Sequence, residues 1–405
     1  MNIIYLSSGC SNSKFNYLTT QKMTQKMPQA QKYHYLLMKG IIANHVDSFV
    51  AISTLPVNST WTKQRFFKRE EEIEDGITFV YPKFTNSVLL RNKTRKMNAF
   101  SEIKKYITKD SVLICDILNN SLSSVAIKCG KKYKVPVVGV VTDVPGFTSG
   151  ARRKSYSFFR RLLSLLVERL NKRNMDKFDM YLFQTKDTNL VVNKKNKPFI
   201  IIEGQCDSNM SSVENTVELK EKPRVVMYAG GIHKEFGIDL FVKAFINAKI
   251  DNCVLDIYGD GNYQNELVEI AKTNKDIHYY GRVANDVVVS KQTKATLLVN
   301  PRLSSELYVR YSFPSKTLES MASGTPLLTT KLPCIPEDYF DYLYFFDNED
   351  VESFKQILIN VLSKTDLELN KKGMMAKQFV LQKKNNIYQA KRLLDFIEKN
   401  RNDNN

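Results

Sequence analysis

A lysine and a glutamate three residues apart lie in the segment of this sequence that is richest in groups able to do chemistry. Lys316 and Glu319 follow Pro314, which restricts the chain before an expected helix with Ser315 as its N-cap and an end near Gly324. Residues three apart share one helical face. A cation beside a helix N-terminus can hold a diphosphate, and a carboxylate one turn on can accept hydrogen bonds from ribose hydroxyls. An ion pair on the surface of a capped helix is the alternative.

Two glycine-containing turns precede this segment. One follows an expected strand over 224–229 and leads to a helix that Gly237 opens, and the other follows an expected strand over 254–259. Glycines let backbone N–H groups approach a phosphate, although each turn can also be an ordinary strand-to-helix connection. Neither is a Walker loop, and Gln264 replaces the third glycine of a dinucleotide fingerprint. The phosphate-binding candidates are Gly230, Gly231, Lys234, Gly259 and Gly261.

Five motifs occur in order over residues 224–330. They read Tyr-Ala-Gly-Gly…Phe-Gly, Ile-Tyr-Gly-Asp-Gly, Tyr-Gly-Arg, Asn-Pro-Arg, which ends at Arg302, and Tyr-Ser-Phe-Pro-Ser-Lys-x-x-Glu-x-Met-Ala-Ser-Gly. This succession resembles the C-terminal half of family 4 (group 1) glycosyltransferases. The resemblance implies an α/β protein of GT-B fold, with two Rossmann-like domains facing a cleft, that uses a nucleotide-sugar donor with retention. It is similar to bacterial enzymes that build capsular, exopolysaccharide or related cell-surface glycans on lipid-linked acceptors.

The sequence departs from the family pattern at several positions. The family has two Glu separated by seven residues; Glu319 matches the second, Tyr311 occupies the first, and Glu306 is a possible substitute five residues earlier. Gly231 and Phe236 stand where the family commonly has Arg and Lys. The resemblance therefore assigns diphosphate binding to Lys316, Arg302 or Lys234.

The family often places a His near the transferred sugar at the end of an N-terminal strand, where this sequence has Thr142 and Asp143. Asp143 can orient an acceptor hydroxyl or cap the following turn. Ser8 and Gly9 resemble the loop that faces the donor phosphates, or form a simple turn. The catalytic candidates are thus Asp143, Glu306 and Lys316. The donor-binding candidates are Ser8, Gly9, Gly230, Gly231, Lys234, Gly259, Gly261, Arg302, Lys316 and Glu319, and no metal ligand is assigned.

The elements that position these groups alternate short β-branched runs with longer amphipathic segments, which is typical of parallel sheets covered by helices. Strands are expected at 2–6, 48–53, 77–81, 112–116, 137–141, 180–184 and 199–203, and then at 224–229, 254–259, 277–280, 295–300, 326–330 and 342–345. The polar stretch 204–222 lacks periodicity and separates the two sets.

Three regions follow from this pattern. We expect an N-terminal Rossmann-like acceptor-binding domain over 1–205 and a C-terminal Rossmann-like nucleotide-sugar-binding domain over 206–385. A last helix with a polar tail, over 386–405, is expected to return to the N-terminal domain. In open α/β sheets, ligands bind beyond the carboxyl ends of the strands.

Charge and composition narrow the class of partner. The 405 residues include 60 Lys and Arg against 42 Asp and Glu, a net charge of +18 that indicates nucleic acid, acidic lipid or a phosphate-rich substrate. No nucleic-acid-binding motif is recognised. Six scattered Cys and four His argue against a disulfide framework or a metal cluster. We expect no cofactor besides the donor, with a UDP-sugar favoured.

Part of this positive charge lies in a basic amphipathic segment over 152–173. Apolar residues recur there at helical spacing beside many Arg and Lys, which is typical of a helix lying in an anionic membrane interface. Packing of its apolar stripe on the N-terminal sheet is the alternative. With no secretory signal and no apolar run of membrane-spanning length, a cytoplasmic protein attached peripherally to the inner face of the cell membrane is expected.

The leading expectation is a retaining hexosyltransferase that uses a nucleoside diphosphate sugar and a lipid-linked or growing cell-surface glycan. Two alternatives stay open. Tyr311 in place of the first Glu is compatible with a catalytically weakened GT-B partner subunit of another glycosyltransferase. The high net charge is compatible with a basic nucleic-acid-binding protein.

Overall fold

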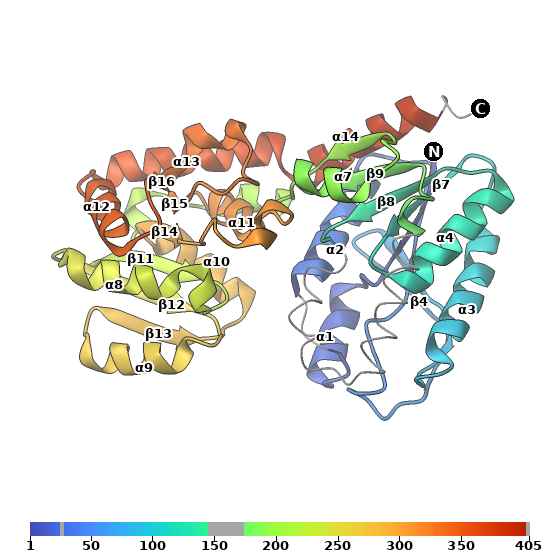
Figure 1. Cartoon of the computed structure of the whole chain (residues 1–405), viewed down its shortest axis with the longest axis horizontal. Helices are drawn as coiled ribbons and strands as arrows, with labels where there is room; N and C mark the ends of the chain where they lie inside the picture. The colour runs from blue at the N-terminus through green and yellow to red at the C-terminus, as the bar shows by residue number, and fades with distance from the viewer. Residues whose placement is uncertain (25–27, 145–173, 402–405) are drawn as a thin grey trace. The chain divides into compact units, whose positions relative to one another are not determined.

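The computed structural model describes residues 1–24, 28–144 and 174–401. The chain forms two compact units, one of residues 1–205 with 386–405 and one of residues 206–385. Each unit has a main sheet of mostly parallel strands flanked by helices (Figure 1). The basic segment 152–173, for which a membrane-lying helix was predicted, lies outside the described residues. No helix in the described ranges is long and apolar enough to span a bilayer.

The sheet of the first unit has the strand order β10-β9-β8-β7-β1-β2-β5-β4, parallel except for β4. Its central strands are buried along their whole length because helices cover both faces, so they read as continuous apolar runs. A short antiparallel ribbon, β3–β6, stands beside this sheet. The strands are β1 (Asn2–Ser7), β2 (Ser48–Ser53), β3 (Phe66–Phe67), β4 (Glu70–Glu74), β5 (Ile77–Tyr81), β6 (Phe84–Thr85), β7 (Ser111–Asp116), β8 (Val137–Val141), β9 (Met180–Phe183) and β10 (Phe199–Ile201).

The helices of the first unit include one from the far end of the sequence. Helix α14 packs against α2, and a side chain at Gly40 would place its Cβ 2.1 Å from the carbonyl oxygen of Asn386. Leu393 and Ile397 of α14 are fully buried in the core of this unit. The described helices are α1 (Asn12–Thr20), α2 (Pro28–Ala43), α3 (Arg91–Tyr106), α4 (Asn120–Tyr133), α7 (Lys186–Val192) and α14 (Asn386–Arg401).

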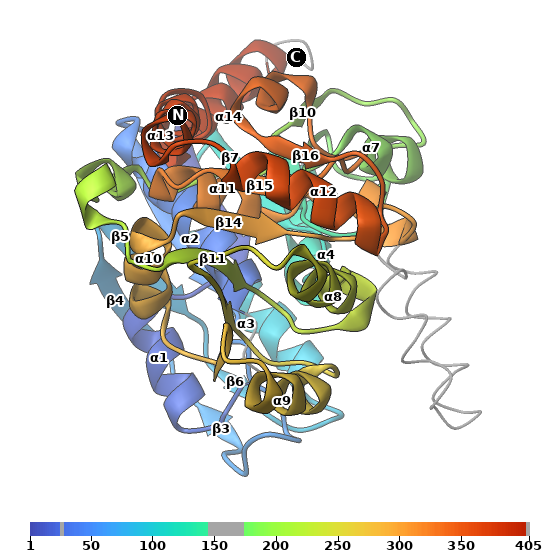
Figure 2. The same ribbon diagram turned by 90° about the vertical axis from the view of Figure 1, so that its left-hand side faces the viewer.

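The second unit has a fully parallel sheet in the order β13-β12-β11-β14-β15-β16. Figure 2 shows β11 and β14 side by side, with α8 and α12 on one face. The strands are β11 (Arg224–Ala229), β12 (Cys253–Tyr258), β13 (Ile277–Gly281), β14 (Leu297–Asn300), β15 (Leu327–Thr330) and β16 (Tyr344–Phe346). The helices are α8 (Ile238–Ala248), α9 (Gln264–Thr273), α10 (Asn285–Lys294), α11 (Ser315–Ser323), α12 (Val351–Leu362) and α13 (Asp366–Lys383), with 3-10 turns η1 (Ser208–Ser212), η2 (Val217–Leu219), η3 (Lys234–Phe236), η4 (Leu307–Arg310) and η5 (Glu337–Tyr342).

The structure departs from the sequence predictions at several places. The two-residue strands β3 and β6 were not predicted. Strand β4 was missed because its sequence, Glu-Glu-Glu-Ile-Glu, is poor in the residue types that favour strands. The stretch expected to be an unpatterned linker forms η1 and η2 and packs on the second unit. The prediction of Ser315 as an N-cap was wrong by one residue: Pro314 is the N-cap of α11, and it offers no side-chain hydrogen bond.

A buried lysine joins η2 to the second unit. Lys220 is 9% exposed and donates hydrogen bonds to the carbonyl oxygen of Thr293, at 2.9 Å, and to the hydroxyl of Thr325, at 3.0 Å. Burial lowers the pKa of Lys220 to about 8, although Asp366 favours the charged form. The folded state therefore binds the Lys220 proton less tightly than the unfolded chain does.

This shift predicts a pH dependence of stability. Below pH 8 Lys220 is charged in both states and its burial costs stability; as the pH rises towards 10.5 it loses its proton in the folded state first. Relative to a Lys220→Met variant, the wild type should gain about 2 to 3 kcal/mol of unfolding free energy between pH 7 and pH 10. Urea unfolding at both pH values measures this gain, and exposed Lys243→Met serves as the control. A constant difference between wild type and Lys220→Met would contradict the assignment.

Candidate functional site

The strand order of the second unit locates a candidate site at the carboxyl edge of its sheet. From β11 the chain adds β12 and β13 on one side, and then β14 on the other side of β11. Connections that leave in opposite directions open a crevice at the carboxyl ends of the two strands. The crevice expected here is flanked by the segment 230–237 after β11 and the segment 301–314 after β14. These two segments hold four of the ten predicted donor-binding residues, namely Gly230, Gly231, Lys234 and Arg302.

Glycines let these segments approach each other closely. Gly237 has φ +71°, and a Cβ there would lie 2.2 Å from the carbonyl oxygen of Pro301. A Cβ at Gly259 would lie 1.8 Å from the carbonyl oxygen of Gly230, and one at Gly261 would lie 2.0 Å from that of Ile232. No larger residue fits these contacts without movement of the backbone.

This packing uses two of the glycine N–H groups that were predicted to bind a phosphate. The N–H of Gly230 donates to the carbonyl oxygen of Tyr258 at 3.0 Å, and the N–H of Gly259 donates to that of Gly281 at 2.8 Å. These two N–H groups were predicted to face a phosphate, but both are already hydrogen-bonded within the protein. For Gly231 the observed hydrogen bond involves the carbonyl oxygen, which accepts from the Tyr228 hydroxyl at 2.7 Å. The main role of these glycines is to allow close packing of the segments that carry the charged side chains.

Arg302 is held at the crevice by two aromatic rings. Its guanidinium carbon lies 4.9 Å from the ring centroid of Phe236 and 4.6 Å from that of Tyr308, and its Nε donates to the Tyr308 hydroxyl at 3.3 Å. The two rings come from the two flanking segments. Stacking restrains the side chain and leaves donors in the guanidinium plane for an anion. No carboxylate of the described residues forms an ion pair with Arg302.

The tyrosine hydroxyls beside Arg302 stay protonated at neutral pH. Burial raises the pKa of Tyr228 and of Tyr308, and the charge of Arg302 opposes both shifts only in part. Burial outweighs the nearby cation because it penalises the phenolate form. Both hydroxyls therefore keep their protons: Tyr228 donates its own to the carbonyl oxygen of Gly231, and the Tyr308 hydroxyl, which accepts from Arg302, can still donate.

A second cation stands at the start of α11. Helix α11 runs from the carboxyl edge back along the sheet, and no side chain caps its N-terminus. Lys316 lies in its first turn, is half-buried, and has no ion-pair or hydrogen-bond partner among the described side chains. A cation beside the positive end of a helix dipole is unfavourable unless an anion joins them. Glu319 lies one turn further along the same helix and is also half-buried.

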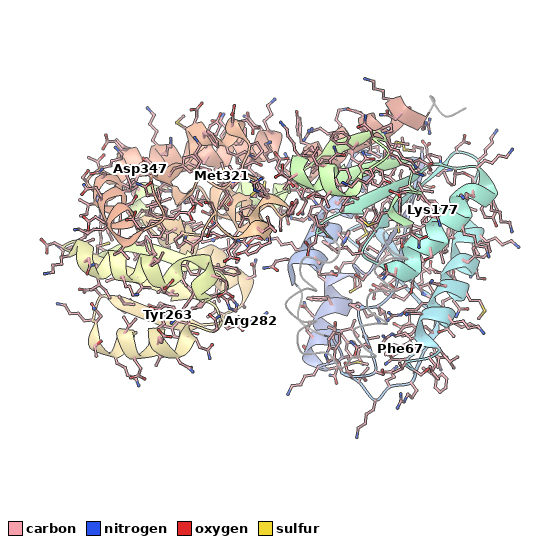
Figure 3. The ribbon with its side chains drawn as sticks, in the orientation of Figure 1. Phe67, Lys177, Tyr263, Arg282, Met321 and Asp347 are labelled. Carbon is pink, nitrogen blue, oxygen red and sulfur yellow. The ribbon has the colours of Figure 1, made fainter. Side chains whose placement is uncertain are left out.

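The third predicted cation is already engaged. Lys234 lies 2.6 Å from a carboxylate oxygen of Glu266 and 5.5 Å from the ring centroid of Tyr263, both in the segment that leads into or forms α9. Arg282, after β13, lies 3.5 Å from a carboxylate oxygen of Asp260. Figure 3 shows Tyr263 and Arg282 at this part of the second unit. The charge of Lys234 is thus partly neutralised, whereas those of Arg302 and Lys316 are not.

An acidic residue that sequence reasoning missed anchors the segment after β14. Both carboxylate oxygens of Glu349 accept from the Ser304 N–H, each at 2.9 Å. Glu306 follows two residues later, is half-buried, and precedes η4, in which Tyr308 lies. Tyr308 and Glu349 carried no motif signal in the sequence, and Phe236 was noted as part of the first motif and as a departure from a family pattern, without a role in holding Arg302.

The candidates of the first unit lie at the carboxyl edge of its own sheet. Gly9 donates its N–H to the Ser7 hydroxyl at 3.0 Å, and Ser8 beside it is half-buried. The Asp143 carboxylate accepts from the N–H of the neighbouring Val144 at 2.8 Å. An acceptor-binding role for Asp143 stays a prediction.

A buried polar cluster lies at the point in the first sheet where strand order reverses, between β1 and β7. The Tyr5 hydroxyl lies 2.8 Å from His34 Nδ1, and His34 Nε2 lies 3.6 Å from a carboxylate oxygen of Asp116. His34 is 2% exposed, so this cluster is closed to solvent and links β1, α2 and β7 inside the first unit. The sequence did not single out these residues, because they come from β1, α2 and β7.

Comparisons with known proteins agree with this geometry. Residues 223–364, about a third of the chain, match the sequence model of the family described as Glycosyl transferases group 1. The matched range holds the whole crevice edge of the second unit, including Arg302 and Lys316. None of the curated proteins matches this sequence.

Solved structures of similar fold cover nearly the whole chain. Sucrose-phosphate synthase from Thermosynechococcus elongatus has a TM-score of 0.67 at 12% identity, over 98% of this chain and 99% of that one. Anabaena HepE in complex with UDP has a TM-score of 0.62 at 11% identity, over 98% and 100%. The pneumococcal O-GlcNAc transferase GtfA in complex with UDP and GlcNAc has a TM-score of 0.59 at 12% identity, over 98% and 99%. The prediction of a GT-B fold is confirmed.

Proposed function

We propose that this chain transfers a hexose from a nucleoside diphosphate sugar, with a UDP-sugar favoured, to a lipid-linked or growing cell-surface glycan. The observation that carries the proposal is Arg302. Two aromatic rings fix its guanidinium at the carboxyl edge of a sheet, where the strand order reverses, and no carboxylate of the described residues neutralises it. A diphosphate matches this site in charge and in hydrogen-bonding geometry.

Catalysis in this proposal comes from stabilising the leaving group. As the bond to the sugar breaks, negative charge develops on the diphosphate, and Arg302, Lys316 and the uncapped N-terminus of α11 act on that charge. Glu319 accepts hydrogen bonds from the ribose. Glu306 and Asp143 are proposed to orient the sugar and the acceptor hydroxyl. No cofactor besides the donor is proposed, because these cations can neutralise the diphosphate.

The choice of donor and mechanism rests on analogy and on chemistry. HepE was solved in complex with UDP and GtfA in complex with UDP and GlcNAc, and both share the fold of this chain. Retention at the anomeric carbon and a role in capsular or exopolysaccharide synthesis are proposed from the resemblance in motifs. A cytoplasmic location with peripheral attachment to the inner face of the cell membrane, partly through residues 152–173, is proposed from their basic amphipathic sequence.

A donor screen tests this proposal. The purified full chain is incubated with UDP- and GDP-hexoses and a lipid-linked acceptor, and the anomeric configuration of the product is read by nuclear magnetic resonance. Transfer with retention is expected for at least one donor. Binding of a nucleotide without transfer would instead support the partner-subunit function, which Tyr311 in place of the first family Glu favours. Binding of neither nucleotide would overturn both.

Lys316→Ala is expected to lower kcat/KM for sugar transfer about 10- to 100-fold, with little change in the melting temperature. The side chain is half-buried and has no partner among the described side chains, so its loss leaves no carboxylate unpaired. Lys331→Ala, which removes an exposed cation after β15, is the matched control. Steady-state kinetics with the donor identified by the screen measure the effect. Equal rates for wild type and Lys316→Ala would remove Lys316 from the site.

A further inference from the structure

The first unit carries an exposed apolar patch with basic residues around it. Two short segments, 61–68 and 88–97, hold six large apolar side chains that project into solvent: Trp61, Phe66, Val88, Leu89, Leu90 and Met97. Leu89 is 88% exposed and Val88 is 79% exposed. Exposed apolar side chains are ordinary when scattered, but contiguous ones mark an interaction surface. We call these two segments the ribbon–helix surface.

Local structure brings the two segments together. Strand β3 pairs with β6, and the N–H of Asn86 donates to the carbonyl oxygen of Arg65 at 2.7 Å. Residues 86–90 then lead directly into α3. Figure 2 shows β3 at one end of the first unit, with β6 and α3 beside it. The six apolar side chains therefore belong to one end of the first unit.

The alternation of side chains along β3 directs Phe66 into solvent. Neighbouring residues of a strand point to opposite sides, and in β3 Phe67 is 6% exposed whereas Phe66 is 72% exposed. Phe67, which Figure 3 labels, stacks on Phe84 with 4.7 Å between ring centroids, and the guanidinium of Arg95 lies 4.4 Å from the Phe84 ring centroid. Arg95 also donates to the carbonyl oxygens of Leu55 and Val57. The contacts of Phe67, Phe84 and Arg95 thus fix β3 in an orientation that leaves Phe66 exposed.

Charge indicates which partner fits this surface. The sequence has no Asp or Glu from Val57 to Arg69 or from Pro82 to Ser101. The nearby acidic strand β4 is engaged elsewhere, since Glu71 pairs with Arg69 and Glu74 accepts from Ser13 and Tyr35. Six cations of the surface form no ion pair with the described residues: Lys63, Arg65, Lys68, Arg91, Lys93 and Lys96.

The start of α3 concentrates positive charge. Its N-terminal N–H groups are partly capped by Ser87, whose hydroxyl accepts from the Leu90 N–H at 3.1 Å, but its first turn contains no acidic residue. Arg91, Lys93 and Lys96 instead place positive charge near the positive end of the helix dipole, which costs stability in water. An anionic partner would relieve this repulsion, and the apolar tip formed by Val88 and Leu89 requires that the same partner also be apolar.

We propose that the ribbon–helix surface binds the interface of an anionic lipid bilayer. Its apolar side chains enter the boundary between headgroups and acyl chains, and its cations contact the lipid phosphates. This inference rests on the proposed function, because binding to such an interface would bring the chain to a lipid-linked acceptor. Vesicle binding requires no sugar transfer, so the two proposals fail separately.

Trp61 makes the test direct, because it is the only tryptophan of the chain and lies within the surface. The full chain is mixed with vesicles of phosphatidylcholine alone, or with a quarter of phosphatidylglycerol, with and without brominated acyl chains. Anionic vesicles are expected to shift the Trp61 emission to the blue, and brominated lipids are expected to quench it. Binding without quenching would place Trp61 outside the bilayer and overturn the proposal, as would absence of binding.

Variants separate this surface from residues 152–173. Lys93→Gln with Lys96→Gln should weaken binding about 30-fold, since each cation near an anionic surface contributes a factor of about five. Val88→Ser with Leu89→Ser should abolish quenching of Trp61. Leu367→Ser, which changes a side chain 70% exposed on the second unit, is the control. Unchanged binding by both double variants, or burial of the surface in a dimer detected by sedimentation, would refute the proposal.

Discussion

Replacement of Arg302 by alanine is expected to weaken nucleoside diphosphate binding about 10- to 150-fold, with an equal or larger loss in kcat/KM. A hydrogen bond to a charged group contributes about 1.5 to 3 kcal/mol, and removal of a donor that acts on developing charge costs at least as much. The side chain already lies against the rings of both Phe236 and Tyr308, so little order has to be gained when the ligand binds. Calorimetric titration with UDP and GDP measures the affinity, and steady-state kinetics measure kcat/KM.

Two further variants identify what Arg302 contributes. Arg302→Lys keeps the charge but loses the planar fork and the stacking, so its affinity should fall between those of wild type and Arg302→Ala. Lys331→Ala removes another cation that stacks on an aromatic ring, 4.2 Å from the Phe340 centroid, and should bind nucleotide normally. Wild-type affinity in Arg302→Ala would show that the diphosphate does not contact this residue.

Gly237→Ala is expected to lower both stability and donor affinity. A Cβ at this position would lie 2.2 Å from the carbonyl oxygen of Pro301, in addition to the strain of φ +71°. The strain costs about 1 to 2 kcal/mol, and the steric overlap is expected to add about 1 to 3 kcal/mol. Relief of the overlap requires separation of the segments that supply Phe236 and Tyr308, so the Arg302 side chain should lose its support. Thermal unfolding and UDP titration measure the two effects.

Gly281 offers a matched control for Gly237. It has nearly the same backbone angle, φ +67°, but nothing lies within 4 Å of the position that its Cβ would take. Gly281→Ala should therefore show only the conformational cost and should bind UDP normally. Similar results for the two variants would indicate that backbone strain, rather than the approach of the two segments, governs the site.

The sequence was sufficient to predict the sheets because parallel strands covered on both faces leave long apolar runs. All thirteen expected strands are present, with ends shifted by at most two residues. Strand β4 escaped detection because its pairing with β5, rather than its residue types, makes it a strand. Ser315 was misplaced as a cap because a sequence does not reveal whether the chain turns before or after such a residue.

The site was only partly predictable for a related reason. Motif spacing selected Arg302 and Lys316, which stand at the crevice edge without carboxylate partners among the described residues. The contacts that hold Arg302 join segments more than sixty residues apart, and no local pattern pairs Phe236 with Tyr308. The glycine turns were found from sequence, but the tight packing of one segment on another, which requires glycine there, appears only in three dimensions.

Calorimetric titration of UDP and GDP into the wild-type chain and into Arg302→Ala tests whether Arg302 binds the diphosphate of the donor. We expect the wild type to bind at least one of the two nucleotides, and the variant, with an unchanged melting temperature, to bind it at least tenfold more weakly. Failure of the folded wild type to bind either nucleotide, or equal binding by both proteins, would contradict this expectation.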